Sequence, residues 1–510
     1  MSGNSRHGDH RHSCGGRAAI RCSPVRRLRP GAFRSPTTSG SGTEDEMTEL
    51  SRRNFMQRAA AVGAGVLLIG SVDALQAIPA SAAPGRPLGY GPLVADPAKR
   101  LALPAGFRYS IVTEAGRTTL ESGEPTPRNH DGTGAFRARG GGTVLVTNHE
   151  IREPWGTELP VPHVDGTVYD AAAAGGCTVV EVGRDGSRSR EWVGVAGTAT
   201  NCAGGQTPWD TWLTCEEIDA LAGKDGFTKD HGYVFEVDPF DRRANRDPQP
   251  VKALGRFEHE AAAVDPRSGA IYLTEDSAKP NGLLYRWTPP RGYKGGKGAL
   301  RRIGPTDGAF AALRATDGAG KHVDDLSRAT AIGTVYAAGW TPVPDRDGRT
   351  TPTRSQLGNG DVTRARKLEG AWWGERGGRA GAYVVSSFAR EESPVQHDGQ
   401  VWFLDPERGT LTLVLRLAVN PGPAADGAFD GPDNISVSPY GGVILAEDGA
   451  GVQHLFGATD DGRTFPLARN EAGDVEFTGP VYSPDRRTLF ANIQEPGVTF
   501  AITGPWRHQR

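Results

Sequence analysis

Six short segments of the chain repeat one pattern, in which a Pro or Gly turn is followed by apolar β-forming residues and then by a polar or acidic cluster. They are residues 143–150, 211–217, 270–276, 382–389, 442–448 and 488–495. Most of them lie about 45 to 70 residues apart, which is close to the length of four strands with their loops. The repeat therefore predicts an all-β fold and favours a β-propeller with loop insertions.

The composition agrees with short strands and many turns. The 510 residues include 70 glycines and 37 prolines spread along the chain, which is typical of tight turns rather than long helices. The formal net charge of -2 gives no electrostatic reason to expect nucleic acid or an acidic membrane as a partner. Small ligands or metal ions fit this charge better.

The first 83 residues differ from the rest. Residues 1–46 lack an apolar period and indicate a disordered extension or a misassigned start, with Met47 as the expected initiator. Residues 47–83 contain SRRNFM at 51–56, an apolar run and then Ala-Ser-Ala at 80–82, which is typical of a twin-arginine signal peptide. A membrane anchor is the alternative, but the run is shorter than the ~20 residues that span a bilayer. We expect the twin-arginine translocation machinery to export a single propeller domain, residues 84–510, as a secreted monomer without stable membrane insertion.

The polar ends of the repeated segments are the first candidates for a site. One end of a propeller channel gathers side chains from segments far apart in the sequence, so these carboxylates could converge there. The alternative is a sandwich in which Asp and Glu are solvated strand ends. Their recurrence favours convergence.

Cys202 lies in TNCAGG, among turn-forming residues. The chain has no CxxC pair and no histidine at a spacing diagnostic of a thiol nucleophile. A thiolate bound to a transition metal and an inert buried thiol are both open. Cys177 and Cys215 are the other cysteines of the exported part, and a disulfide between them is a second open question.

Four further motifs offer charged side chains. Glu150 follows Asn148-His149, where a metal role for His149 is as plausible as a structural turn. Arg256 could bind a phosphate or pair with nearby glutamates, and Lys367 with Glu369 could be a functional cation–carboxylate pair or a surface ion pair. Asp433 and Glu447 lie on the two arms of a hairpin whose oxygens suit Ca2+.

In order along the chain, TNHE, NCAGGQTPWDTWLTCEE, GRFEHEAAAVDPRSGAIYLTED, KLEG and GPDNISVSPYGGVILAED resemble the PhoX family of secreted alkaline phosphatases. The resemblance implies a six-bladed β-propeller whose channel holds Fe3+ and Ca2+, with Cys202 bridging the irons. It maps metal-ligating glutamates onto Glu216, Glu260, Glu369 and Glu447, with Glu150 and Asp433 as further calcium ligands; of the adjacent pair, Glu216 is preferred over Glu217.

The family hydrolyses phosphomonoesters, so the resemblance implies such substrates here. Where the family has an arginine two residues before the KLEG glutamate, this chain has Lys367, which keeps the charge but loses the planar two-pronged contact with phosphate. Lys367 and Arg256 are the expected catalytic cations. Two alternatives stay open: a calcium-dependent lactonase or esterase, and a propeller that only binds a ligand.

Overall fold

The computed structural model describes residues 87–164, 166–389, 393–419 and 427–509. The expected extension at 1–46 and the expected signal peptide at 47–83 lie outside these residues. The described part contains no α-helix and only single 3-10 turns, which are η1 (Lys252–Leu254), η2 (Leu300–Arg302), η3 (Leu326–Arg328) and η4 (Thr353–Ser355).

The strands in chain order are β1 (Leu93–Val94), β2 (Leu101–Pro104), β3 (Arg108–Glu114), β4 (His130–Arg137), β5 (Thr143–His149), β6 (Gly175–Val182), β7 (Arg188–Thr198), β8 (Asn201–Gln206), β9 (Trp212–Glu216), β10 (Val234–Val237), β11 (His259–Val264), β12 (Ile271–Glu275), β13 (Leu284–Thr288), β14 (Ala309–Thr316), β15 (His322–Val323), β16 (Val335–Pro342), β17 (Leu368–Arg376), β18 (Arg379–Ser386), β19 (Gly399–Asp405), β20 (Thr410–Leu417), β21 (Pro432–Val437), β22 (Val443–Glu447), β23 (His454–Ala458), β24 (Thr464–Asn470), β25 (Phe477–Tyr482), β26 (Thr488–Ile493) and β27 (Val498–Thr503).

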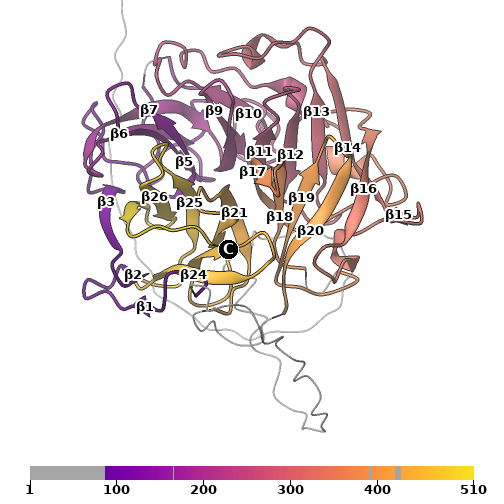
Figure 1. Cartoon of the computed structure of the whole chain (residues 1–510). Coiled ribbons are helices and arrows are strands. Elements are labelled where there is room, and N and C mark those ends of the chain that lie inside the picture. The colour runs from indigo at the N-terminus through magenta and orange to yellow at the C-terminus, as the bar shows by residue number, and fades with distance from the viewer. Residues whose placement is uncertain (1–86, 165, 390–392, 420–426, 510) are drawn as a thin grey trace, which may run out of the picture. The chain divides into compact units, whose positions relative to one another are not determined.

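These strands form a β-propeller built from antiparallel sheets (Figure 1). Six strands lie innermost, and each contacts the next in a closed cycle: β4, β8, β11, β17, β21, β25 and again β4. The side chains of neighbouring sheets pack between them and form the buried core. The predicted all-β propeller is confirmed.

All six repeated segments are strands, namely β5, β9, β12, β18, β22 and β26. We expected these segments to line the channel themselves, as innermost strands. They are not the innermost strands. Each is the antiparallel partner of an innermost strand. Because antiparallel partners run in opposite directions, the end of each repeated segment lies beside the start of an innermost strand, so its polar residues still reach one end of the channel.

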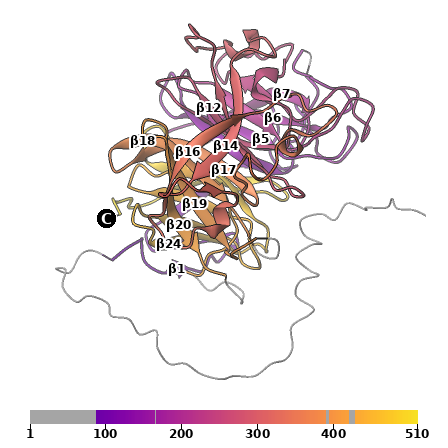
Figure 2. The same cartoon turned by 90° about the vertical axis from the view of Figure 1, so that its right-hand side faces the viewer.

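Strands from the beginning and the end of the described residues close the cycle. β3 pairs with β27, and β2 pairs with β24, so N-terminal strands complete sheets that are otherwise C-terminal. The long interval after residue 276 contains the expected insertion. Its strand β16 pairs with β14 and with β20 and joins two runs of strands into one ten-stranded sheet (Figure 2).

Candidate metal centre

Every innermost strand has the same irregularity near its start. Two of its residues face a single residue of the partner strand, which is a β-bulge. A bulge changes the direction in which a side chain points. The first bulge residues of the six strands are Asp131, Cys202, Glu260, Glu369, Asp433 and Gly479. Five of the six positions therefore present a carboxylate or a thiol at the same end of the channel.

Side chains at this end form three groups of possible metal ligands, each with its ligand atoms within 4.8 Å of one another. Glu260 belongs to two of the groups and Asp433 to two, so the three groups are joined. We call the whole set the acidic cluster: Cys202, Glu217, Glu260, Glu369, Asp433, Asp448 and Glu476.

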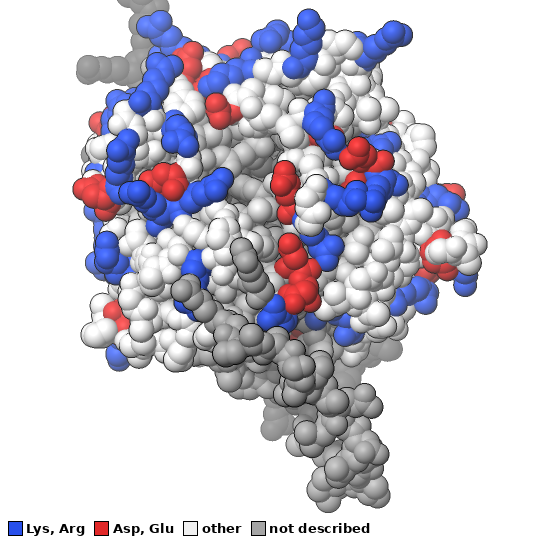
Figure 3. Space-filling model, viewed as in Figure 1, with Lys and Arg blue, Asp and Glu red and all other residues white. Residues whose placement is uncertain are grey.

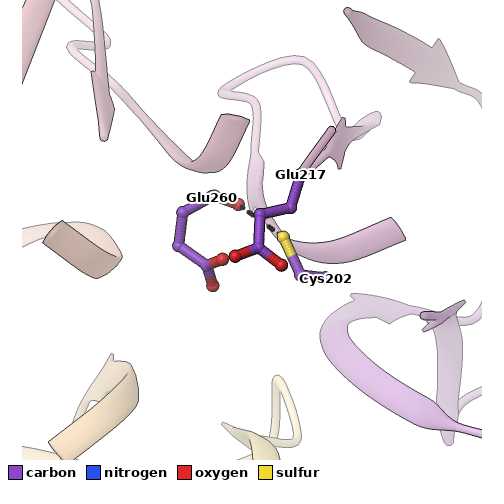
Figure 4. A group of neighbouring side chains, drawn as sticks. All are labelled: Cys202, Glu217 and Glu260. Carbon is purple, nitrogen blue, oxygen red and sulfur yellow. Dashed lines mark hydrogen bonds between the residues drawn. The ribbon is translucent and has the colours of Figure 1, made fainter. Parts of the chain in front are cut away.

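Figure 4 shows one end of the acidic cluster. The carboxylates of Glu217 and Glu260 point toward one another beside the sulfur of Cys202. The Cys202 thiol also lies 3.3 Å from the carbonyl oxygen of His259 and 3.6 Å from that of Glu260. All three side chains are at least 96 % buried. The thiol and two carboxylates therefore converge in a site nearly removed from water.

Burial and mutual repulsion dominate the electrostatics of the acidic cluster. Burial raises the pKa of Glu260 well above its ordinary value, and the charges of Asp433 and Glu369 raise it further. Burial, with Glu260 and Glu217 nearby, raises the pKa of the Cys202 thiol in the same way. Cations would relieve this repulsion, and carboxylates suit Ca2+ while a thiolate suits a transition metal. The donor set thus fits a centre that holds oxygen-preferring cations together with a transition metal.

The two glutamates that close β9 have different positions. Glu216, the expected ligand, accepts hydrogen bonds from three backbone N–H groups within 3.1 Å and lies 2.6 Å from Nδ1 of His231. Glu217 is the one beside Cys202 and Glu260. Successive residues of a strand point to opposite sides, so only one of the pair can face the channel. The structure therefore places Glu217, and not Glu216, in the acidic cluster.

The end of β22 repeats this division of roles. Glu447, another expected ligand, accepts hydrogen bonds from the backbone N–H groups of Asp430 and His454 and from Nδ1 of His454 at 2.8 Å. The next residue, Asp448, lies with Asp433 and Glu476. In both hairpins the first carboxylate holds the hairpin together and the second faces the channel.

Glu150 lies at the margin of the acidic cluster. The side-chain amide of Gln494 donates to Glu150 at 2.6 Å and to the bulge residue Asp131 at 3.3 Å. His149 has a structural role, because its ring nitrogens contact the Arg128 carbonyl at 2.8 Å and the Thr178 hydroxyl at 3.0 Å. Burial lowers the pKa of His149 to about 4, so the ring is neutral near pH 7.

Arg256 is not brought to the acidic cluster. It precedes β11, and its buried guanidinium pairs with Asp219 and donates to the carbonyl oxygens of Asp347 and Gly348. Arg256 therefore anchors the inserted loop after β16 and pairs with Asp219 rather than with the nearby glutamates of its own segment.

Lys367 is placed beside the acidic cluster. Its ammonium lies 2.5 Å from Glu369 and 3.5 Å from Asp276, and its side chain is 25 % exposed. The backbone of Lys367 has φ +47°, a conformation that side-chain-bearing residues rarely adopt. A cation that borders the cluster and is open to solvent can contact an anionic substrate.

The disulfide between Cys177 and Cys215, which the sequence left open, does not form in this structure. Cys177 and Cys215 are free and buried, and burial raises the pKa of the Cys177 thiol to about 12. Both thiols therefore stay protonated and unreactive at neutral pH.

Several members of the acidic cluster escaped prediction from the sequence: Glu217, Asp448 and Glu476. Strand alternation was the signal for Glu217 and Asp448, since each follows a residue that faces its own hairpin. Asp131 could have been found by aligning the bulges, where HDGT, NCAG, HEAA, LEGA and PDNI occupy equivalent positions. Glu476 precedes β25 outside any repeated pattern.

Charges of both signs occur on the molecular surface. On the face shown in Figure 3, acidic side chains gather near the middle, and Lys and Arg side chains are spread around them. The basic side chains on this face are thus interspersed with acidic ones.

Comparison with known proteins adds to this picture. The family model described as alkaline phosphatase PhoX matches residues 88–192 and 185–497. The solved structure of Pseudomonas fluorescens PhoX in complex with vanadate, a transition-state analogue, is 19 % identical, with a TM-score of 0.61 over 82 % of this chain and 98 % of that one. This likeness shows a shared fold.

A second solved structure, the pyranose dehydrogenase PQQ domain from Coprinopsis cinerea, is 9 % identical. It has a TM-score of 0.40 over 79 % of this chain and 97 % of that one. The sequence matches none of the curated proteins with which it was compared.

Proposed function

Because the chain belongs to the alkaline phosphatase PhoX family and is thus a phosphatase, we propose that it hydrolyses phosphomonoesters and releases inorganic phosphate at the acidic cluster. One observation carries this proposal: the thiol and the six carboxylates of the acidic cluster converge at one end of the channel, although they come from five separate parts of the propeller. Such a set of like charges is costly to bury without cations, so the site is built for metal ions.

Cys202, Glu217 and Glu260 would hold iron, since this group alone offers a thiolate. Glu369, Asp433, Asp448 and Glu476 would hold calcium through oxygen ligands. When bound, such ions position a phosphate and neutralise the charge that develops on its oxygens. Lys367 would attract and orient the phosphate at the margin of the site, as a point charge rather than a two-pronged donor.

Two experiments test this function. Protein exported in folded form should hydrolyse p-nitrophenyl phosphate in the presence of Ca2+, lose the activity in a chelator, and contain iron and calcium by elemental analysis. Cys202→Ala should lose iron and activity together, while the matched variant Cys177→Ala, which removes a buried thiol from a blade, should keep both.

Full phosphatase activity of Cys202→Ala without iron would contradict the proposed centre. Calcium alone, with hydrolysis of lactones and not of phosphate esters, would favour the lactonase alternative. A protein that holds calcium and hydrolyses neither substrate would favour a binding propeller.

We infer further that the propeller has six blades. The six innermost strands, each with an equivalent bulge among the described residues, support this number. The sheet that contains β16 would then be two blades joined by an inserted strand.

Export through the twin-arginine route and secretion of a monomer are also proposals, supported by SRRNFM and the Ala-Ser-Ala site. Among the described residues, no helix is long and apolar enough to cross a membrane. Replacing Arg52 and Arg53 by Lys should keep the protein inside the cell, which fractionation and immunoblotting would detect.

A further inference from the structure

The channel contains a small cavity directly next to the acidic cluster. Its volume is about 20 Å3, which is enough for about one water molecule. All six innermost strands line it through their second bulge residues, Gly132, Ala203, Ala261, Gly370, Asn434 and Pro480. Each of these residues follows the first bulge residue, so the cavity lies one residue farther along the channel than the metal-ligand positions.

A second and larger cavity, of about 250 Å3, lies farther along three of these strands, β8, β11 and β17. Its lining includes Gln206 at the end of β8, Val264 at the end of β11 and Trp373 in β17. These residues follow the bulges of their strands by several positions. The larger cavity therefore lies toward the end of the channel opposite the acidic cluster.

Trp372 of β17 lines both cavities. Its side chain also packs against three separate parts of the core, which contain Ile435, Trp212 and Val481. These parts belong to different sheets, so the indole reaches from β17 across the channel. At this level the strands β4, β8 and β11 contribute only Gly, Ala and other short side chains, and the two large rings that line the smaller cavity are those of Trp372 and of Trp212 in β9.

We propose that Trp372 closes the channel behind the acidic cluster, so that ions, water and substrate reach the cluster from one end only. The indole separates a cavity that holds about one water molecule from a cavity more than ten times larger. A channel left open at this point would let water and chelators approach the cluster from behind. The proposal concerns access to the cluster and does not depend on which ions bind there.

The test compares Trp372→Ala with Trp373→Ala by hydrogen exchange and mass spectrometry on metal-free protein. Trp373 is the matched control, because it lines the larger cavity but not the smaller one and packs on another part of the core. Trp372→Ala should speed exchange at least tenfold in peptides that carry the bulges of β8, β11 and β17. Indole added to the buffer should refill the gap and restore protection.

A second measurement uses protein that retains metal after purification. Loss of the metal to a chelator, followed by elemental analysis, should be at least tenfold faster in Trp372→Ala than in the wild-type protein or Trp373→Ala. If Trp372→Ala is not recovered folded, Trp372→Phe replaces it and should give smaller changes in the same direction.

Unchanged exchange in the bulge peptides of the Trp372 variant would overturn the proposal, and so would an equal increase in Trp373→Ala. The exchange result stands even if the protein proves to hold no metal. Failure of the Trp372 proposal is therefore distinguishable from failure of the proposed function.

Discussion

Glu216 and Glu217 are adjacent in the sequence but serve opposite sides of one hairpin. The Glu216 carboxylate binds three backbone N–H groups and His231, whereas the Glu217 carboxylate lies within 4.8 Å of the Cys202 thiol. One residue therefore holds the hairpin, and the other contributes to the acidic cluster.

The amide substitutions of this pair should separate stability from activity. In Glu216→Gln one accepting oxygen becomes an NH2 group, so buried N–H donors lose their hydrogen-bond acceptor. The free energy of unfolding should fall by about 2–4 kcal/mol. Glu217→Gln should leave folding nearly unchanged but reduce bound metal and lower kcat/KM at least 100-fold. Urea unfolding and p-nitrophenyl phosphate kinetics measure the two effects. Equal loss of activity with normal folding in both variants would contradict this division of roles.

Lys367 should determine how well the substrate binds. Lys367→Ala removes the cation nearest Glu369 and should raise KM for p-nitrophenyl phosphate about tenfold or more. Lys367→Arg introduces the planar guanidinium of the family pattern, which can make a two-pronged contact with phosphate. This variant should have a KM below the wild-type value. The control is Lys321→Ala at an exposed position. If all three variants have the wild-type KM, Lys367 does not contact the phosphate.

Glu275 should make stability depend on pH. Burial raises the pKa of Glu275 to about 7, and the nearby charge of Glu258 acts in the same direction. Arg354 and the Tyr285 hydroxyl favour the charged form and oppose this shift. The unfolded chain ionises first as the pH rises, so the contribution of Glu275 is full below pH 4.5 and is lost by about pH 7. The loss amounts to at most about 3 kcal/mol. Subtracting the stability of Glu275→Gln from that of the wild-type protein at each pH should reveal this slope, and parallel curves would refute it.

The innermost strands approach each other too closely for a side chain at Gly132. A Cβ atom there would lie 2.6 Å from the Ala203 Cα and 2.8 Å from the Cys202 carbonyl oxygen. Gly132→Ala should therefore displace the bulge of β8, lower stability by about 1–3 kcal/mol and reduce bound metal. Gly140→Ala, where no atom lies within 4 Å, should change stability by less than about 0.5 kcal/mol. Thermal unfolding and elemental analysis compare the two variants.

Local pattern was enough to predict the strands and the kind of fold. Apolar runs that follow a Gly or Pro turn predicted all six repeated strands. The order of strands within each sheet was not predictable in this way. The first residues of the innermost strands include Asp, Gly or Asn, which are also typical of turns. The start of β4, HDGT, is an example.

The acidic cluster shows where local pattern is insufficient. Strand alternation predicts that only one of two adjacent carboxylates faces the channel, but which of the two does so depends on the register of the hairpin. Arg256 would share a strand face with Glu258, two residues later, only if both lay in a strand, but β11 begins at His259. Glu476 comes to Asp433 only through the packing of separate hairpins.

The pairing of β3 with β27 has a consequence for how the protein is made. Residues from the first and last parts of the described chain, such as Thr113 and Thr499, are partners in one sheet. The propeller therefore cannot close on the ribosome until the last strand has been synthesised. A chain that stops before β27 lacks the strand that pairs with β3. Because β3 and β27 lie side by side, the order of the hairpins is cyclic, so a circular permutant of the propeller that connects these two strands and is opened in an exposed turn should retain the fold.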